Sequence, residues 1–123
     1  MKFFTPKEAN KTLPLVKRIV SDILDTSDDI RAEVIGREEE EIDKHAVEVL
    51  KELLSDYINE LQEIGCLYKD WNFEIGLVDF PAIIDGDHVY LCWKSDEESV
   101  RHYHGTEAGF AGRKEIPLKY FED

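Results

Sequence analysis

Apolar residues in the first half of the chain recur every three or four positions, which is the spacing of one face of an α-helix. A first series comprises Leu13, Val16, Val20, Ile23, Ile30 and Val34, with Ser27 interrupting it. A second series comprises Ala46, Val49, Leu50, Leu53, Leu54, Tyr57, Leu61 and Ile64. The two series predict a long antiparallel hairpin of two amphipathic helices, one from residue 13 to about residue 36 and one over residues 42–64.

Local signals mark the ends of these helices. Thr5 can cap a helix that begins at Pro6, because a glutamate stands three residues after Thr5 as a capping box requires. Pro14 follows soon afterwards and cannot donate a backbone hydrogen bond, so we expect a short first helix or a kink there. The acidic run of residues 38–41 complements the dipole at the start of the second helix, and Gly65 ends that helix.

After residue 65 the pattern changes to short apolar or alternating runs, which are typical of β-strands. These runs cover residues 66–69, 76–84, 88–93 and 100–104. Asp85 and Gly86 separate the second run from the third and favour a tight hairpin, because glycine readily takes the positive φ that such a turn requires. Pro81 cannot donate to a sheet ladder, so we expect it at an edge position or a bulge.

These elements predict an α+β fold in which the long antiparallel helical hairpin packs on a small antiparallel sheet of three to four strands. The length of 123 residues suits a single domain. Within it we expect a helical hairpin over residues 1–65, a β unit over 66–113 and a C-terminal tail over 114–123. We expect so small a sheet to leave part of the helical apolar faces uncovered, and a second copy of the chain to cover them in a symmetric homodimer.

Composition narrows the classes of partner. The formal net charge is −13, and both halves of the chain are acidic, which argues against nucleic acid and against anionic membrane surfaces. The chain has no run of about 18 apolar residues that could cross a bilayer, and its N-terminus lacks the pattern of a signal peptide. We therefore expect a cytoplasmic protein with two free thiols, whose partners are a second copy or another protein.

The β unit holds most of the chemically versatile side chains. His102 and His104 are two residues apart, so on a strand both point to one side and could share a divalent zinc, iron or manganese ion. Cys92, Asp79 and the neighbouring acidic residues 97 and 98 are candidates for the remaining ligands. The alternative is that the histidines are solvated or hydrogen-bonded without any metal.

Asp79 lies within an apolar run, and a carboxylate in such a place needs a partner if it is buried. Candidate partners are Arg113, Arg101, Lys94 and backbone N–H groups near the following proline; a position beside Arg113 would keep Asp79 ionised. The alternative is an edge carboxylate that points into water. Cys92 is most simply a small core residue, because a nucleophilic thiolate needs a neighbouring imidazole or positive charge.

Four segments, taken together, carry a resemblance to a known family. They are Phe4-Thr-Pro-Lys-Glu8, Gly76-Leu-Val-Asp-Phe-Pro81, Val89-Tyr-Leu-Cys-Trp93 and Gly109-Phe-Ala-Gly-Arg113. The chain resembles, over most of its length, the small prokaryotic proteins catalogued as domain of unknown function 2203, a family that implies no established activity, substrate or cofactor. The resemblance also implies one recurring constellation, which consists of Asp70, Asp79, Trp93, Glu98, His104 and Arg113.

Two functional classes are compatible with these observations. The favoured one is a non-enzymatic interaction or scaffold module that self-associates through the helical hairpin, with the β unit as a structural cap. The alternative is a protein that binds a small molecule or a divalent metal, including a metal-assisted hydrolase, with its site in the β unit. For that site the ligand-binding candidates are Asp70, Asp79, Trp93, Glu98 and Arg113, and the metal candidates are His102, His104 and Cys92.

Overall fold

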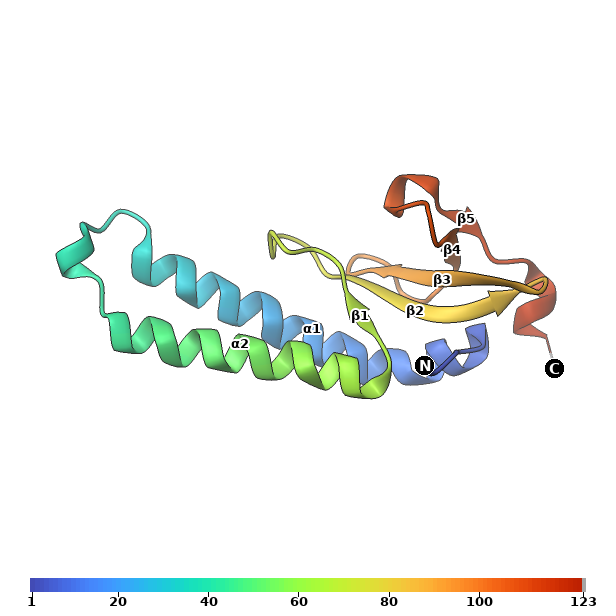
Figure 1. Ribbon diagram of the computed structural model, residues 1–123, viewed down its shortest axis with the longest axis horizontal. Helices are drawn as coiled ribbons and strands as arrows, with labels where there is room; N and C mark the ends of the chain where they lie inside the picture. Colours follow the sequence, from blue (N-terminus) through green and yellow to red (C-terminus); the bar gives the residue numbers. More distant parts are fainter. Residues whose placement is uncertain (123) are drawn as a thin grey trace.

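The computed structural model describes residues 1–122 and shows a helical hairpin packed against a five-stranded antiparallel sheet (Figure 1). The helices are α1 (Pro6–Val34) and α2 (Lys44–Ile64), with the 3-10 turn η1 (Glu39–Glu41) between them. The strands, in their order across the sheet, are β1 (Leu67–Tyr68), β2 (Leu77–Ile84), β3 (Asp87–Lys94), β4 (His102–Gly105) and β5 (Lys114–Glu115). The 3-10 turns η2 (Phe110–Gly112) and η3 (Leu118–Phe121) flank β5.

The α+β prediction is therefore confirmed, although the sheet has five strands rather than three to four. The additional strand, β5, consists of two residues in the segment expected to be a tail, and it pairs with β4. Periodicity cannot reveal a strand of two residues, because two positions do not define an alternation. Neither helix of the described chain carries an apolar stretch long enough to cross a bilayer.

Helix α1 begins as predicted, with a capping box in which the Thr5 side chain accepts from the Glu8 backbone and the Glu8 side chain accepts from Thr5. The expectation of a short first helix is wrong, since α1 continues through Pro14 for 29 residues. Leu13 and Val16 are buried on either side of this proline, and their packing offsets the loss of one backbone hydrogen bond.

Helix α2 begins at Lys44, two residues later than predicted. The Asp43 side chain caps it by accepting from the backbone N–H of Ala46 at 3.0 Å, and the acidic run forms the separate turn η1. Gly65 ends the helix with a φ of 103°, as its position in the sequence predicts.

The hairpin between β2 and β3 is confirmed, because Ile84 pairs with Asp87 across the two-residue turn Asp85-Gly86. Both turn residues have positive φ, 51° and 86°. Pro81 occupies an interior strand, but β1 pairs only with Val78 and Asp79, so the side of β2 next to Pro81 is free of any other strand. There the backbone N–H of Phe4 donates to the Pro81 carbonyl at 2.7 Å.

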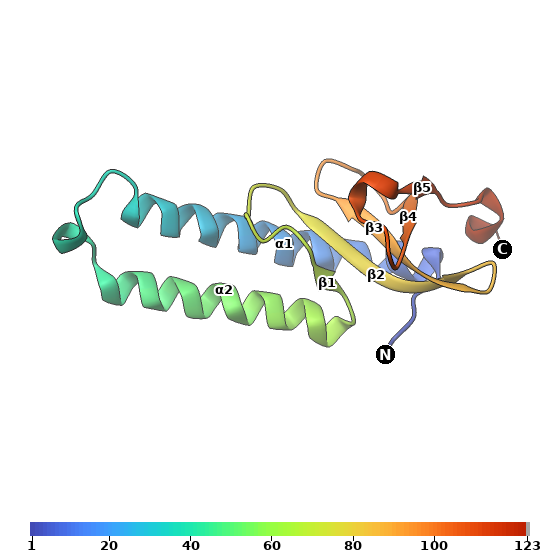
Figure 2. The ribbon, with the colours of Figure 1, turned by 45° about the horizontal axis from the view of Figure 1, so that its top comes forward.

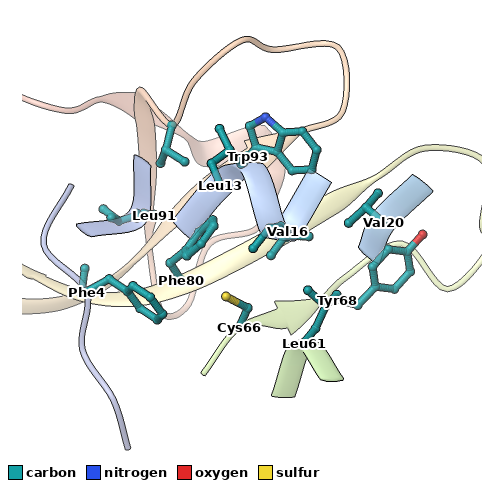
Figure 3. Packing of buried hydrophobic residues seen from close by; sticks show 14 of the residues in the cluster. Phe4, Leu13, Val16, Val20, Leu61, Cys66, Tyr68, Phe80, Leu91 and Trp93 are labelled. Atoms are coloured by element: carbon teal, nitrogen blue, oxygen red, sulfur yellow. The ribbon is translucent and has the colours of Figure 1, made fainter. Parts of the chain in front are cut away.

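The main core lies between α1 and one face of the sheet (Figure 3). Phe80 from β2 and Leu91 and Trp93 from β3 pack there against Leu13 and Val16, and all five are buried. Successive side chains of a strand point to opposite faces, so the neighbours of Phe80 and Leu91 point away from the helices. The candidate site therefore lies on the sheet face that the helices do not cover.

The helical hairpin is longer than the sheet that covers it. The end of the hairpin that contains η1 extends beyond the sheet in both ribbon views (Figure 2). In α2 only Val47 and Leu61 are buried, although the helix has 21 residues. Val49 and Leu53 remain 44% and 39% exposed, so part of the predicted apolar face of α2 is uncovered.

Candidate metal centre

Three different metal-ligating side chains converge on the sheet face that points away from the helices. Asp79 on β2 pairs directly with Cys92 on β3, and His104 on β4 pairs with the half-buried Tyr90 on the same face. One carboxylate oxygen, the Cys92 Sγ and one imidazole nitrogen all lie within 4.8 Å of one another. The three residues are between 1% and 5% exposed, so the cluster is buried.

The orientation of His104 is fixed at both ring nitrogens. Nδ1 lies 2.9 Å from the backbone carbonyl oxygen of Gly105, and because a carbonyl only accepts, Nδ1 must carry the hydrogen. Nε2 faces Asp79 and lies 3.1 Å from both of its carboxylate oxygens. One proton must therefore lie between Nε2 and Asp79 to complete this hydrogen bond, and this is the position that a cation could take instead.

The carboxyl group of Asp79 is in an unfavourable place for a negative charge. Burial raises its pKa above the ordinary value, although His104, Lys69 and a hydrogen bond from the Cys92 thiol act in the opposite direction. The net shift shows that these neighbours offset only part of the desolvation cost.

Cys92 is a protonated thiol in the metal-free protein. Burial, together with the charge of Asp79, raises its pKa to about 12. His104 is directed at Asp79 and not at the sulfur, so it does not act as a base for Cys92. A free nucleophilic thiolate is therefore not supported, whereas a bound metal ion would itself favour the thiolate.

The three donors line a pocket of about 280 Å³, so a solute can reach them. The pocket is bounded on one side by Lys69 and Leu77 and on the other by the loop that follows β4. Its full lining is Lys69, Leu77, Asp79, Tyr90, Cys92, His104, Thr106, Ala108, Gly109 and Phe110. Phe110 lies under the Arg113 guanidinium at 4.6 Å, which holds this loop over the sheet.

A model of the family described as "Uncharacterized conserved protein (DUF2203)" matches residues 2–116. The chain belongs to the DUF2203 family. The resemblance noted in the sequence is thus confirmed, and the matched range includes all three donors and the whole pocket. No curated protein and no solved structure matches the chain.

In this DUF2203 chain Arg113 is paired with Glu97 and not with Asp79. Its Nη2 lies 2.9 Å from both Glu97 carboxylate oxygens and 3.3 Å from the carbonyl oxygen of Cys92. Glu97 also accepts from the backbone N–H of Lys94 at 2.8 Å. The expected cationic partners of Asp79 were therefore wrong: the turn after β3 brings a carboxylate to Arg113, and β4 brings an imidazole to Asp79.

His102 stands on the same face as His104 but outside the cluster. Its Nδ1 lies 3.5 Å from a carboxylate oxygen of Glu97, and it is paired across the sheet with Cys92. The predicted pair of histidine ligands is thus divided, because the three-residue cluster includes only His104.

Three further candidates lie away from the pocket. Asp70 accepts hydrogen bonds from three backbone N–H groups of its own loop, at 2.8 to 3.1 Å. Trp93 is buried on the opposite face, where its indole N–H donates to the Glu97 carbonyl. The Glu98 side chain is exposed, and its backbone carbonyl accepts from Lys17.

Sequence reasoning missed two contributors to the site. The Gly105 carbonyl orients His104, and a main-chain atom of this kind leaves no mark in residue types. Lys69 is the second contributor. Its backbone N–H donates to the Leu77 carbonyl at 2.8 Å, which continues the pairing of β1 with β2 and places Lys69 at the rim of the pocket. A register derived from the Tyr68 and Val78 pair could have found Lys69, but β1 is too short for its register to be read from a pattern.

Proposed function

We propose that this protein binds one divalent transition-metal ion, preferentially zinc, through Asp79, Cys92 and the Nε2 of His104. The observation that carries the proposal is the convergence of three buried donors of different chemistry within 4.8 Å. A mixed set of sulfur, nitrogen and oxygen suits zinc, and the thiolate disfavours manganese relative to zinc or iron.

The spacing of the donors supports this proposal. Zinc bonds of about 2.0–2.3 Å separate neighbouring donors in a tetrahedral site by roughly 3.3–3.7 Å. The present separations lie at or below 4.8 Å, so side-chain rotations without strand movement would bring the donors to an ion. Three protein donors leave the fourth position open, which is the arrangement of catalytic rather than structural zinc.

The surroundings of the donors support it as well. Metal-ligating histidines commonly donate their other ring N–H to a carbonyl or carboxylate, as His104 does to Gly105. A divalent cation would offset the part of the desolvation cost of Asp79 that its neighbours leave, and it would displace the Cys92 thiol proton. All three donors line the pocket, so the class of activity that fits is metal-assisted binding or hydrolysis of a small molecule.

The test is native mass spectrometry with elemental analysis on protein that is purified without a histidine tag, stripped of metal and titrated with zinc. We expect one zinc per chain. Cys92→Ser and His104→Ala should weaken zinc binding by at least about 100-fold, because each removes a direct ligand.

The controls are matched by residue type and burial. Cys66 is likewise a buried free thiol with a pKa raised to about 12, but it belongs to the helix-facing core, so Cys66→Ser should keep the zinc. His102→Ala should also retain the bound zinc. Absence of saturable zinc uptake, or loss of zinc in His102→Ala but not in His104→Ala, would refute the proposed centre.

We also propose that the protein self-associates through α2. The proposed contacts are Val49 and Leu53, two exposed apolar side chains of α2. Helix α2 carries two lysines and five acidic residues, so charge does not favour this pairing. The occupant that we propose is a second copy of the chain, because a two-fold axis brings the same apolar patch of both copies together.

Sedimentation velocity tests this second proposal. The wild-type chain is expected to be a dimer, and Leu53→Asp a monomer with the same circular dichroism spectrum. Leu15 is 47% exposed on α1, so Leu15→Asp is the matched control and should remain dimeric. A monomeric wild type over the micromolar range would end the dimer proposal and leave the metal centre untouched.

A further inference from the structure

We infer that the open side of the metal centre accepts a small organic carboxylate, with one oxygen at the cation and the charge facing Lys69. This inference rests on the proposed function, and it names the ligand class of the same pocket. It is carried by the charge balance of the site, the position of Lys69 and the composition of the pocket walls.

The charge balance favours a single negative charge on the ligand. A divalent cation held by one carboxylate, one thiolate and one neutral imidazole gives a centre with no net charge. Lys69 adds one positive charge at the rim and forms no salt bridge with any residue in 1–122. A carboxylate would leave the pocket neutral, whereas a phosphate dianion would leave it with an excess negative charge in an already acidic protein.

Lys69 is directed to this side of the sheet by the strand register. Tyr68 pairs with Val78, and the Lys69 N–H donates to the Leu77 carbonyl, so Lys69 stands opposite Leu77 on the face of Asp79. Lys69 and Asp79 both line the same pocket. An ammonium group in this lining can pair with the second oxygen of a bound carboxylate.

The walls of the pocket indicate that the rest of the ligand is short and largely apolar. Leu77 and Phe110 offer apolar surface, and Thr106 offers one hydroxyl group. The volume of about 280 Å³ lies at the lower limit of typical small-molecule sites. These features suit a short-chain carboxylate and leave little room for a nucleotide or a peptide.

The test uses protein loaded with cobalt(II), whose visible absorption depends on the ligands at the metal. The probe is butyrate, with butyramide as the neutral analogue and inorganic phosphate as the alternative oxyanion. Butyrate should change the cobalt spectrum in a saturable way, and butyramide should not. Phosphate should bind more weakly than butyrate.

Lys69→Met keeps the aliphatic stem and removes the charge. It should reduce butyrate affinity by about 10-fold or more, the usual effect of losing a charge-assisted hydrogen bond, with cobalt stoichiometry unchanged. Lys51→Met, on the exposed surface of α2, is the control and should leave butyrate affinity unchanged.

The outcomes separate the two proposals. If no cobalt spectrum develops, the metal centre itself is wrong. If the spectrum develops but butyrate leaves it unchanged, or butyrate binds equally well to Lys69→Met, the carboxylate inference is overturned while the metal centre stands. Tighter binding of phosphate than of butyrate would also overturn the inference.

Discussion

Asp79 is buried, and desolvation raises the pKa of its carboxyl group although His104 and Lys69 act in the opposite direction. Below the ordinary pKa of 3.8 this carboxyl is protonated in both the folded and the unfolded chain, so its burial costs little. As pH rises through the higher pKa of the folded state, the folded chain must bury an ionised carboxylate, and the free energy of unfolding falls. Residues selected for a ligand commonly carry a cost of this kind.

The metal-free Asp79→Asn variant should therefore gain free energy of unfolding, relative to wild type, as pH is raised from 3.5 to 7. Urea denaturation at the two pH values measures this difference. Asp85→Asn is the control with the opposite sign, because hydrogen bonds from Tyr120 and Lys119 lower the pKa of Asp85. A larger relative gain for Asp79→Asn at acidic pH would contradict the view that desolvation dominates at this position.

The helix ends and the β2–β3 turn are well predicted at the scale of single elements, because their signals are local. The turn also aligns two of the three donors. Asp79 stands six residues before Asp85 and Cys92 six residues after Gly86, so a two-residue turn places them opposite each other. The third donor could not be found in this way, since β4 joins β3 through a loop whose length does not fix the register.

Helix α1 is a case in which a local sequence signal gives the wrong prediction. Pro14 carries a genuine helix-breaking signal, but nine buried residues along α1 outweigh it.

The pairing of Arg113 with Glu97 was missed for a related reason. Both residues lie outside regular strands in the sequence pattern, and only the folded turn brings their side chains together.

Gly76, the residue immediately before β2, lies where the chain passes close to α1. An added Cβ would lie 2.4 Å from Val20 Cγ1 and 2.9 Å from Ser95 Cβ. Gly76→Ala should therefore lower the free energy of unfolding by about 1–3 kcal/mol through overpacking. Gly109→Ala is the control, because a Cβ there meets no atom within 4 Å, and its stability should change by no more than about 0.5 kcal/mol. Equal stabilities in chemical denaturation would mean that β2 lies farther from α1.

At the scale of the whole molecule, ligand binding at the centre should be visible as stability. The donors come from β2, β3 and β4, so an ion would connect three strands that are separate in the sequence. Because the unfolded chain does not assemble this set, zinc should stabilise the folded state.

At a free zinc concentration 100 times the Kd, the expected stabilisation is about 2.7 kcal/mol. For a domain of this size that corresponds to an increase of roughly 10 °C in Tm. Differential scanning calorimetry with zinc and with EDTA measures it. His104→Ala should show no zinc-dependent increase, whereas Cys66→Ser should retain the full effect; an equal increase in both variants would indicate nonspecific binding.

The most direct test of the metal centre is a crystal structure of the zinc-loaded protein, with anomalous diffraction recorded on both sides of the zinc absorption edge. We expect one strong anomalous peak at about 2.0–2.3 Å from Asp79, Cys92 Sγ and His104 Nε2, with its fourth position facing the pocket. An intact hydrogen bond between Asp79 and His104 in those crystals, with zinc absent or bound only at surface carboxylates, would contradict it.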